Sequence, residues 1–198
     1  MADLSRRFVL LGSAATAVAL AGPALAISES NARVLVGRLV DEINRVIASG
    51  KTESGMIRDF EAVFARYADV PTIARSALGP AARGASSGEL SAFTTAFRGY
   101  MARKYGKRFR EFAGGQIQVK SATNRGKFFE VQSLAILRGS SPFDITFRVS
   151  DRSGKDLFFD LLIEGISLLS TERVEIGAML DRAGGDVGRL TQTLRSTG

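Results

Sequence analysis

The feature of this chain that most constrains its fold is a change in the spacing of apolar residues near its middle. Up to about residue 112 apolar side chains recur every three or four positions, which is the spacing of one helix face. After Gly114 and Gly115 they alternate with polar residues, most clearly over Phe143–Ser150, where Phe, Ile, Phe and Val occupy every second position. Such alternation predicts strands with one buried face and one solvent-facing face. Helical spacing returns near the end of the chain, so helices should precede and follow a sheet.

The same spacing places the individual elements. Helices are predicted over residues 32–48, 54–67, 69–78, 88–112, 171–182 and 186–194, and strands over residues 116–120, 128–137, 143–150 and 157–163. Turn residues separate the strands, which favours consecutive antiparallel pairing. The expected fold class is therefore α+β, with a four-stranded antiparallel meander sheet covered by helices from both ends of the chain.

The helix predicted over residues 88–112 is apolar over more of its circumference than one core stripe requires. Its apolar residues are Leu90, Phe93, Phe97, Tyr100, Met101, Tyr105, Phe109 and Phe112. Two protein neighbours would explain this breadth, and so would one protein neighbour together with a ligand made of hydrocarbon. The sequence leaves both explanations open.

The first 26 residues have the pattern of an export signal. Arg6 and Arg7 form a basic start, and a weakly apolar stretch over residues 8–21 follows, which is too short for the roughly 20 residues that span a bilayer. Ala24 and Ala26 then supply an A-x-A cleavage pattern. A membrane anchor or a buried helix is the alternative. We predict cleavage near Ala26, periplasmic localisation and a single mature domain over residues 27–198; the paired arginines also resemble a twin-arginine signal.

Two residue types are missing, and their absence excludes several kinds of site. The chain has no cysteine and no histidine, which rules out disulfides, Cys/His zinc sites and histidine-based catalytic triads. No cofactor and no metal site are predicted. The formal net charge of +7 favours anionic membranes or nucleic acid, and export argues against nucleic acid while allowing transient contact with a membrane surface.

Two stretches resemble the MlaC, or toluene-tolerance, family of periplasmic phospholipid-binding proteins. The first is Tyr-Ala-Asp-Val-Pro-Thr-Ile-Ala-Arg-Ser-Ala-Leu-Gly over residues 67–79, followed by Phe-Arg-Gly-Tyr over residues 97–100. The second is Phe-Phe-Asp over residues 158–160, followed by Ile-Glu-Gly-Ile-Ser-Leu over residues 163–168, and it is the more specific of the two. The likeness runs in order through nearly all of residues 27–198.

This resemblance implies a soluble shuttle that carries phospholipid between the outer and inner membranes, with the acyl chains in an apolar pocket between the sheet and the helices. It implies two partners: an inner-membrane ABC transporter complex with its substrate-receiving subunit, and an outer-membrane lipoprotein complex. Members of the family often have Trp where this chain has Asp156, and this chain has no Trp. A carrier for another apolar lipid, such as a hopanoid, is therefore a second interpretation.

The candidate site residues are apolar side chains that would line such a pocket and cations that would meet phosphate at its mouth. The lipid-binding candidates are Ile73, Leu78, Phe97, Met101, Tyr105, Phe147, Phe159, Leu161, Ile166 and Leu169, and the head-group candidates are Arg103, Lys104 and Arg108. Ordinary core packing is the alternative for each apolar residue, because apolar periodicity does not separate a core from a pocket. A solvated helix face is the alternative for the cations.

No residue is predicted to be catalytic. Asp160 and Glu164 are spaced as a carboxylate pair, which raises the alternative of a hydrolase on a similar scaffold. No nucleophile or electrophile accompanies the pair, and acidic residues where a strand leads into a helix commonly serve a structural purpose.

Overall fold

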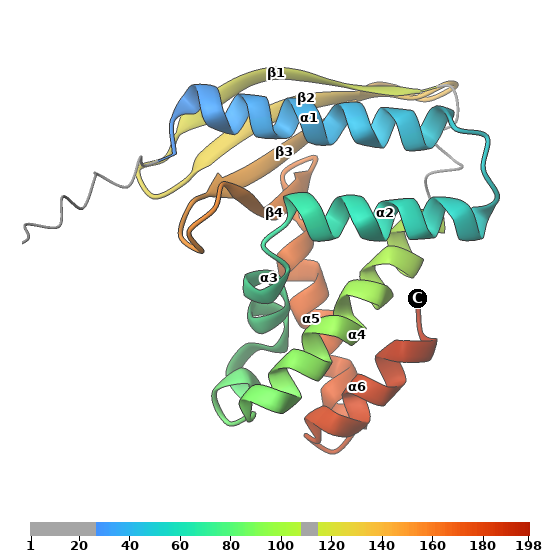
Figure 1. Ribbon diagram of the computed structural model, residues 1–198, viewed down its shortest axis with the longest axis vertical. Coiled ribbons are helices and arrows are strands. Elements are labelled where there is room, and N and C mark those ends of the chain that lie inside the picture. The colour runs from blue at the N-terminus through green and yellow to red at the C-terminus, as the bar shows by residue number, and fades with distance from the viewer. Residues whose placement is uncertain (1–26, 108–114) are drawn as a thin grey trace, which may run out of the picture.

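The structure is a computed structural model that describes residues 27–107 and 115–198 (Figure 1). Its helices are α1 (Glu29–Ala48), α2 (Glu53–Tyr67), α3 (Val70–Leu78), the 3-10 helix η1 (Gly79–Arg83), α4 (Ser87–Gly106), α5 (Leu168–Arg182) and α6 (Val187–Ser196). Its strands are β1 (Gln116–Asn124), β2 (Phe129–Ile136), β3 (Phe143–Ser150), β4 (Leu157–Ile163) and β5 (Ile166–Ser167). Within the two described ranges, no helix combines the length and the apolarity needed to cross a bilayer.

The strands form one antiparallel sheet in the order of the sequence. β3 confirms the predicted alternation, because Ile145, Phe147 and Val149 are buried. Phe147 lies opposite Val131 on β2 and opposite Leu161 on β4. Side chains directly opposite one another share a face of the sheet, so one face of the three central strands is apolar and is available to pack against helices.

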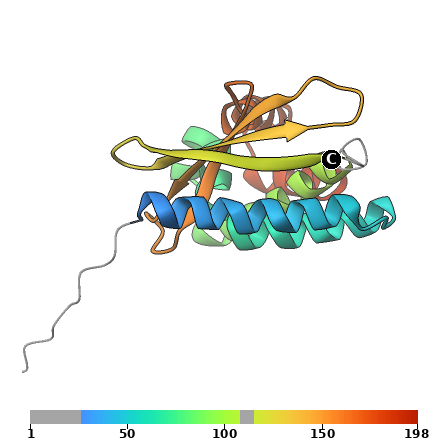
Figure 2. The ribbon, with the colours of Figure 1, turned by 90° about the horizontal axis from the view of Figure 1, so that it is seen from above.

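Helix α1 runs along the sheet beside β1, and α2 returns beside α1 (Figures 1 and 2). Asn44 on α1 holds the helix beside β1 through the oxygen and the nitrogen of its side-chain amide. The backbone N–H of Ile117 donates to Asn44 Oδ1 at 3.0 Å, and Asn44 Nδ2 donates to the Ile117 carbonyl at 3.2 Å. Because β1 is an edge strand, these bonds satisfy backbone groups that no described strand pairs on that side.

The other helices form a second layer beyond the sheet (Figure 1). α4 packs against α2, α3 and α6, and α3 packs against α5. Phe93, Phe97 and Tyr100 on α4 are almost completely buried, with ring centroids 5.8 and 6.2 Å apart along the series. Protein neighbours therefore account for this part of the broad apolar surface of α4.

The expected α+β class with an antiparallel sheet is confirmed, but the strand count was wrong: the sheet has five strands, not four. β5 has two residues and pairs with the end of β4 through a turn at Glu164 and Gly165, whose φ angles are 49° and 78°. Two residues are too few to produce a recognisable alternation. The predicted end of the long helix, with Phe109, Phe112 and Gly114, lies outside the described residues.

Candidate functional site

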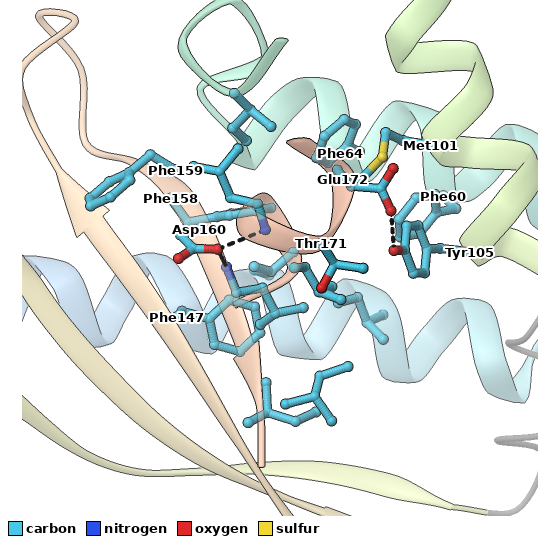
Figure 3. A pocket seen from close by; sticks show the side chains of 18 of the residues that line it. Phe60, Phe64, Met101, Tyr105, Phe147, Phe158, Phe159, Asp160, Thr171 and Glu172 are labelled. Carbon is cyan, nitrogen blue, oxygen red and sulfur yellow. Dashed lines mark hydrogen bonds between the residues drawn. The ribbon is translucent and has the colours of Figure 1, made fainter. Parts of the chain in front are cut away.

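A cavity of about 560 Å³ lies between the sheet and the helices. Its walls come from α1, α2, α3, α4 and α5 on the helical side and from β1, β3 and β4 on the sheet side. The apolar lining residues are Leu39, Ile43, Phe60, Phe64, Ile73, Met101, Ile117, Leu137, Phe143, Ile145, Phe147, Phe158, Phe159, Leu161, Ile163, Leu168 and Leu169. Figure 3 shows how side chains from these separate elements converge.

The sheet side of the cavity follows from the pleat of β3 and β4. Ile145 and Phe147 occupy the buried face of β3, and Leu161 on β4 lies opposite Phe147. The pairing between β3 and β4 shifts by one residue next to Val149, so Phe158 rather than Phe159 lies opposite that valine. An extra residue of this kind bends the strand and turns a side chain to a new direction.

Polar side chains gather at one end of the cavity, where α4 faces α5. Lys104 Nζ donates to Glu172 Oε1 at 2.7 Å and also pairs with Glu175. Tyr105 donates to Glu172, and Tyr100 donates to Glu175 Oε1 at 2.8 Å (Figure 3 shows the bond between Tyr105 and Glu172). One cation therefore meets two carboxylates, and the cluster carries a net negative charge when both are ionised.

Burial and the two carboxylates perturb the titration of this cluster. Burial first, and the negative charge of Glu172 next, raise the pKa of Tyr100, and burial together with its hydrogen bond to Glu172 raises the pKa of Tyr105. Burial acts to lower the pKa of Lys104, but its bonds to the carboxylates outweigh it and the pKa is raised. Burial acts to raise the pKa of Glu175, whereas hydrogen bonds from Lys104 and Tyr100 outweigh it and lower this pKa. The lysine is thus held in its charged form by its neighbours.

Glu172 is the most deeply placed member of this cluster. Its side chain is 1% exposed, and its second oxygen, Oε2, has no hydrogen-bond partner among the described residues. A buried carboxylate left without a cation is strongly unfavourable. Lys104 is therefore required to balance Glu172, which leaves it little capacity to bind a phosphate group.

Asp160, at the other end of the group in Figure 3, joins β4 to the beginning of α5. Its carboxylate accepts hydrogen bonds from the backbone N–H of Leu169 at 3.1 Å and from the hydroxyl of Ser167 at 2.8 Å, and Arg148 lies 3.3 Å away. Glu164 accepts from the backbone N–H of Asp144 instead. The two acidic residues thus hold separate pieces of backbone and share no bond.

Seven of the ten predicted lipid-binding residues lie at the cavity. Those seven are Ile73, Met101, Tyr105, Phe147, Phe159, Leu161 and Leu169. Met101 and Tyr105 show that the broad apolar surface of α4 faces both protein neighbours and the cavity. The ring of Phe159 extends away from the other labelled rings (Figure 3), and its edge-to-face partner is Phe128, with centroids 5.6 Å apart.

The other three predicted lipid-binding residues lie elsewhere, which corrects their placement. Leu78 is buried at the end of α3, in the layer that packs against α4 and α5. Phe97 packs between Phe93 and Tyr100, one turn of α4 before Met101. Ile166 is 67% exposed on β5.

The three head-group candidates do not form one site. Lys104 lines the cavity but is bound to carboxylates, as described above. Arg103 faces α6, where it donates to the carbonyls of Thr197, at 2.9 Å, and Leu194. Arg108 lies outside the described residues. The two described cations of this set therefore hold helices together rather than standing in solvent.

Sequence reasoning missed several lining residues. Leu39 and Ile43 on α1 and Phe60 and Phe64 on α2 belong to the predicted apolar helix faces, but nothing in their spacing shows that they border a cavity. Glu172 was missed because its lysine partner lies 68 positions earlier in the chain. Among the described residues, no group of three acidic side chains could hold a metal ion.

Comparison with known proteins gives a family match and a fold match. The family model described as MlaC protein matches residues 37–196. A solved structure of a phospholipid-binding protein from Ralstonia solanacearum, in complex with a phospholipid, is similar with a TM-score of 0.71 and 19% identity, over 82% of this chain and 94% of that one. At this identity the likeness establishes the fold. No curated protein matches the chain.

Proposed function

This chain belongs to the MlaC protein family, and we propose that it is a soluble carrier that holds phospholipid acyl chains in the cavity between its sheet and its helices. We propose further that it works in the periplasm after cleavage near Ala26. There it would exchange phospholipid with an inner-membrane ABC transporter complex, through the substrate-receiving subunit of that complex, and with an outer-membrane lipoprotein complex.

The observation that carries this proposal is the apolar cavity itself. An acyl chain that leaves a bilayer for water loses about 0.8 kcal/mol for each exposed methylene. A carrier therefore has to replace the bilayer around most of the chain. Aliphatic and aromatic residues from eight elements of the fold surround the cavity of about 560 Å³. Polar groups at its wall are few: Lys104 and Tyr105 both bond to Glu172, and Asp160 accepts from a backbone N–H.

The charges at the polar end of the cavity indicate where the lipid head group lies. Lys104 is balanced by Glu172 and Glu175, so the polar end of the cavity has no spare positive charge for a phosphate. An anionic head group finds no unpaired lysine in this cluster and meets two carboxyl groups instead. We infer that the lipid enters with its acyl chains first and that its phosphate stays outside this end.

The structural neighbour from Ralstonia solanacearum supports a phospholipid as the cargo, because that protein has this fold and was solved with a phospholipid bound. A hopanoid carrier remains the second candidate, since an apolar cavity accepts any hydrocarbon of suitable size. Identification of the molecule that copurifies with the protein separates the two.

The proposal involves no bond-breaking step. The hydrolase alternative depends on Asp160 and Glu164, and each of these carboxylates accepts backbone hydrogen bonds at a different place. If the protein were a hydrolase of this kind, Asp160→Asn together with Glu164→Gln would abolish lipid cleavage. We expect instead that incubation with phospholipid gives no free fatty acid with either the original chain or this variant.

Two substitutions on the same helix test the carrier proposal. Leu169→Lys places a charge at the cavity wall, and Val174→Lys places the same charge on the opposite, 75% exposed side of α5. Native mass spectrometry of the exported protein should find bound phospholipid in the original chain and in the Val174 variant, and much less in the Leu169 variant. Circular dichroism checks that both variants are folded. Finding no lipid in the original chain under gentle extraction would count against the proposal.

A further inference from the structure

Ile27 contacts a carboxylate that is distant from it in the sequence. Its backbone N–H donates to Asp151 Oδ2 at 2.9 Å, across 124 positions. Asp151 directly follows β3 and begins the turn that leads to β4. The side chain of Ile27 is partly buried and packs against the hydrophobic core. The nitrogen of Ile27 is therefore held beside this carboxylate by packing as well as by the hydrogen bond.

The turn that begins at Asp151 carries charges of both signs, because Arg152 and Lys155 lie between Asp151 and Asp156. Asp156 lies in the same turn, and burial first, with the negative charge of Asp151 next, raises the pKa of Asp156. Among the described residues, neither carboxylate forms an ion pair with a lysine or arginine. Glu29 adds a third negative charge in the first turn of α1. The positive end of the α1 dipole opposes the binding of a positive charge at this place.

We propose that Asp151 is the docking site for the N-terminal ammonium that cleavage after Ala26 creates on Ile27. Hydrolysis of the peptide bond between these residues consumes one water molecule and leaves a carboxylate on Ala26 and an amine on Ile27. The amine takes up a proton below its ordinary pKa of about 7.7 to 8.0. A hydrogen bond from an uncharged amide to the carboxylate thereby becomes an ion pair with a charge on both partners, which is stronger.

The ion pair would couple signal removal to the stability of the fold. It joins Ile27, two residues before α1, to the turn between β3 and β4, and Ser28 next to it caps α1 by accepting from the N–H of Asn31 at 3.1 Å. The uncleaved chain has an amide at the same place, so its donor to the carboxylate carries no charge. The mature chain is therefore more stable than its precursor for a reason that is independent of any cargo.

The dependence on pH follows from the pKa of the new amine. The ion pair raises this pKa in the folded state above its unfolded value of about 7.7 to 8.0. The added stability is therefore fully present below that unfolded value and is lost as the pH rises through the folded pKa. The precursor has no amine at this position, so the two forms converge at high pH.

A thermodynamic cycle tests the docking site. The full chain is exported and purified in its cleaved form, and its precursor is purified from a cleavage-resistant Ala26→Tyr variant; intact mass then locates the first residue of each. Asp151→Asn is placed in both forms, and Asp181→Asn, an exposed carboxylate on α5, is the matched control. We expect Asp151→Asn to lower the Tm of the mature form by about 2 to 4 °C more than that of the precursor at pH 6, which is the shift of about 1 kcal/mol for a domain of this size.

At pH 10 this extra loss should vanish, and Asp181→Asn should show no difference between the two forms at either pH. A mature chain that begins at another residue would overturn the proposal, and so would an equal effect of Asp151→Asn on both forms. The variants leave the cavity unchanged. A protein without bound lipid would therefore argue against the carrier function and not against this docking site.

Discussion

The length of an acyl chain should set its affinity for this protein up to a limit fixed by the cavity. Each methylene that moves from water into an apolar site contributes about 0.8 kcal/mol, which is about a fourfold change in Kd. A cavity of about 560 Å³ holds about 19 methylene-sized groups if each takes roughly 30 Å³, the volume of one water molecule in the liquid. We expect the Kd of single-chain phospholipids to fall about fourfold per methylene and to level off near that length.

Displacement of a fluorescent fatty acid, at lipid concentrations below micelle formation, measures this series. Leu161→Phe enlarges a side chain at the cavity wall and should move the limit to shorter chains. Ile166→Phe enlarges a side chain that is 67% exposed and should leave the limit in place. A Kd that does not change with chain length below the limit would refute the reasoning, because it would mean that the acyl chain is not buried.

Three further predictions concern the structure around the cavity. Lys104→Met should lower the free energy of unfolding by about 2 to 3 kcal/mol in urea denaturation. The loss is smaller than for a fully buried pair because the Lys104 side chain is 26% exposed. Adding Glu172→Leu should recover much of the loss, because it removes the carboxylate that lost its cation. The pKa values of Tyr100 and Tyr105 are raised by burial, so the unfolded state loses these protons first. Stability should therefore fall as the pH rises above about 10, which an alkaline series of thermal melts would detect. Gly165→Ala forces a side chain into a φ of 78° and should cost about 1 to 2 kcal/mol in the same urea assay.

The strand and helix framework could be predicted from the sequence because it depends on local periodicity. Phe143–Ser150 alternates without interruption, so its buried face was correct residue by residue for Ile145, Phe147 and Val149. β5 could not be found in this way, since its two residues form a strand only by pairing with Ile163 and Leu162. Its turn residues, Glu and Gly, were visible in the sequence but are also common at the beginning of a helix.

The placement of the cavity depended on information that periodicity does not contain. Phe97 and Met101 are four positions apart and so lie on the same side of α4, yet one packs in the helical core and the other borders the cavity. The difference arises along the helix axis, because the cavity reaches α4 at Met101 and Tyr105 and not at Phe97. The sequence makes Lys104 a candidate for binding phosphate, whereas the structure pairs it with two carboxylates on α5. A sequence shows the charge of a side chain but not the group that neutralises it.

The size of the cavity leads to a last prediction, which concerns the protein after its lipid has been removed. In cores that lose side chains, an unfilled cavity costs about 24 cal/mol for each Å³. That slope describes closed, dry cavities, and this cavity of about 560 Å³ is partly open to solvent, so leaving it without lipid costs less than the slope would give but has the same sign. The fold therefore gains stability when hydrocarbon fills the cavity, by the same linkage through which any ligand of the native state stabilises a protein. We expect delipidation under mild denaturation to lower the Tm, and readdition of phospholipid to restore it. An unchanged Tm after complete delipidation would mean that the walls of the cavity close on one another without cost.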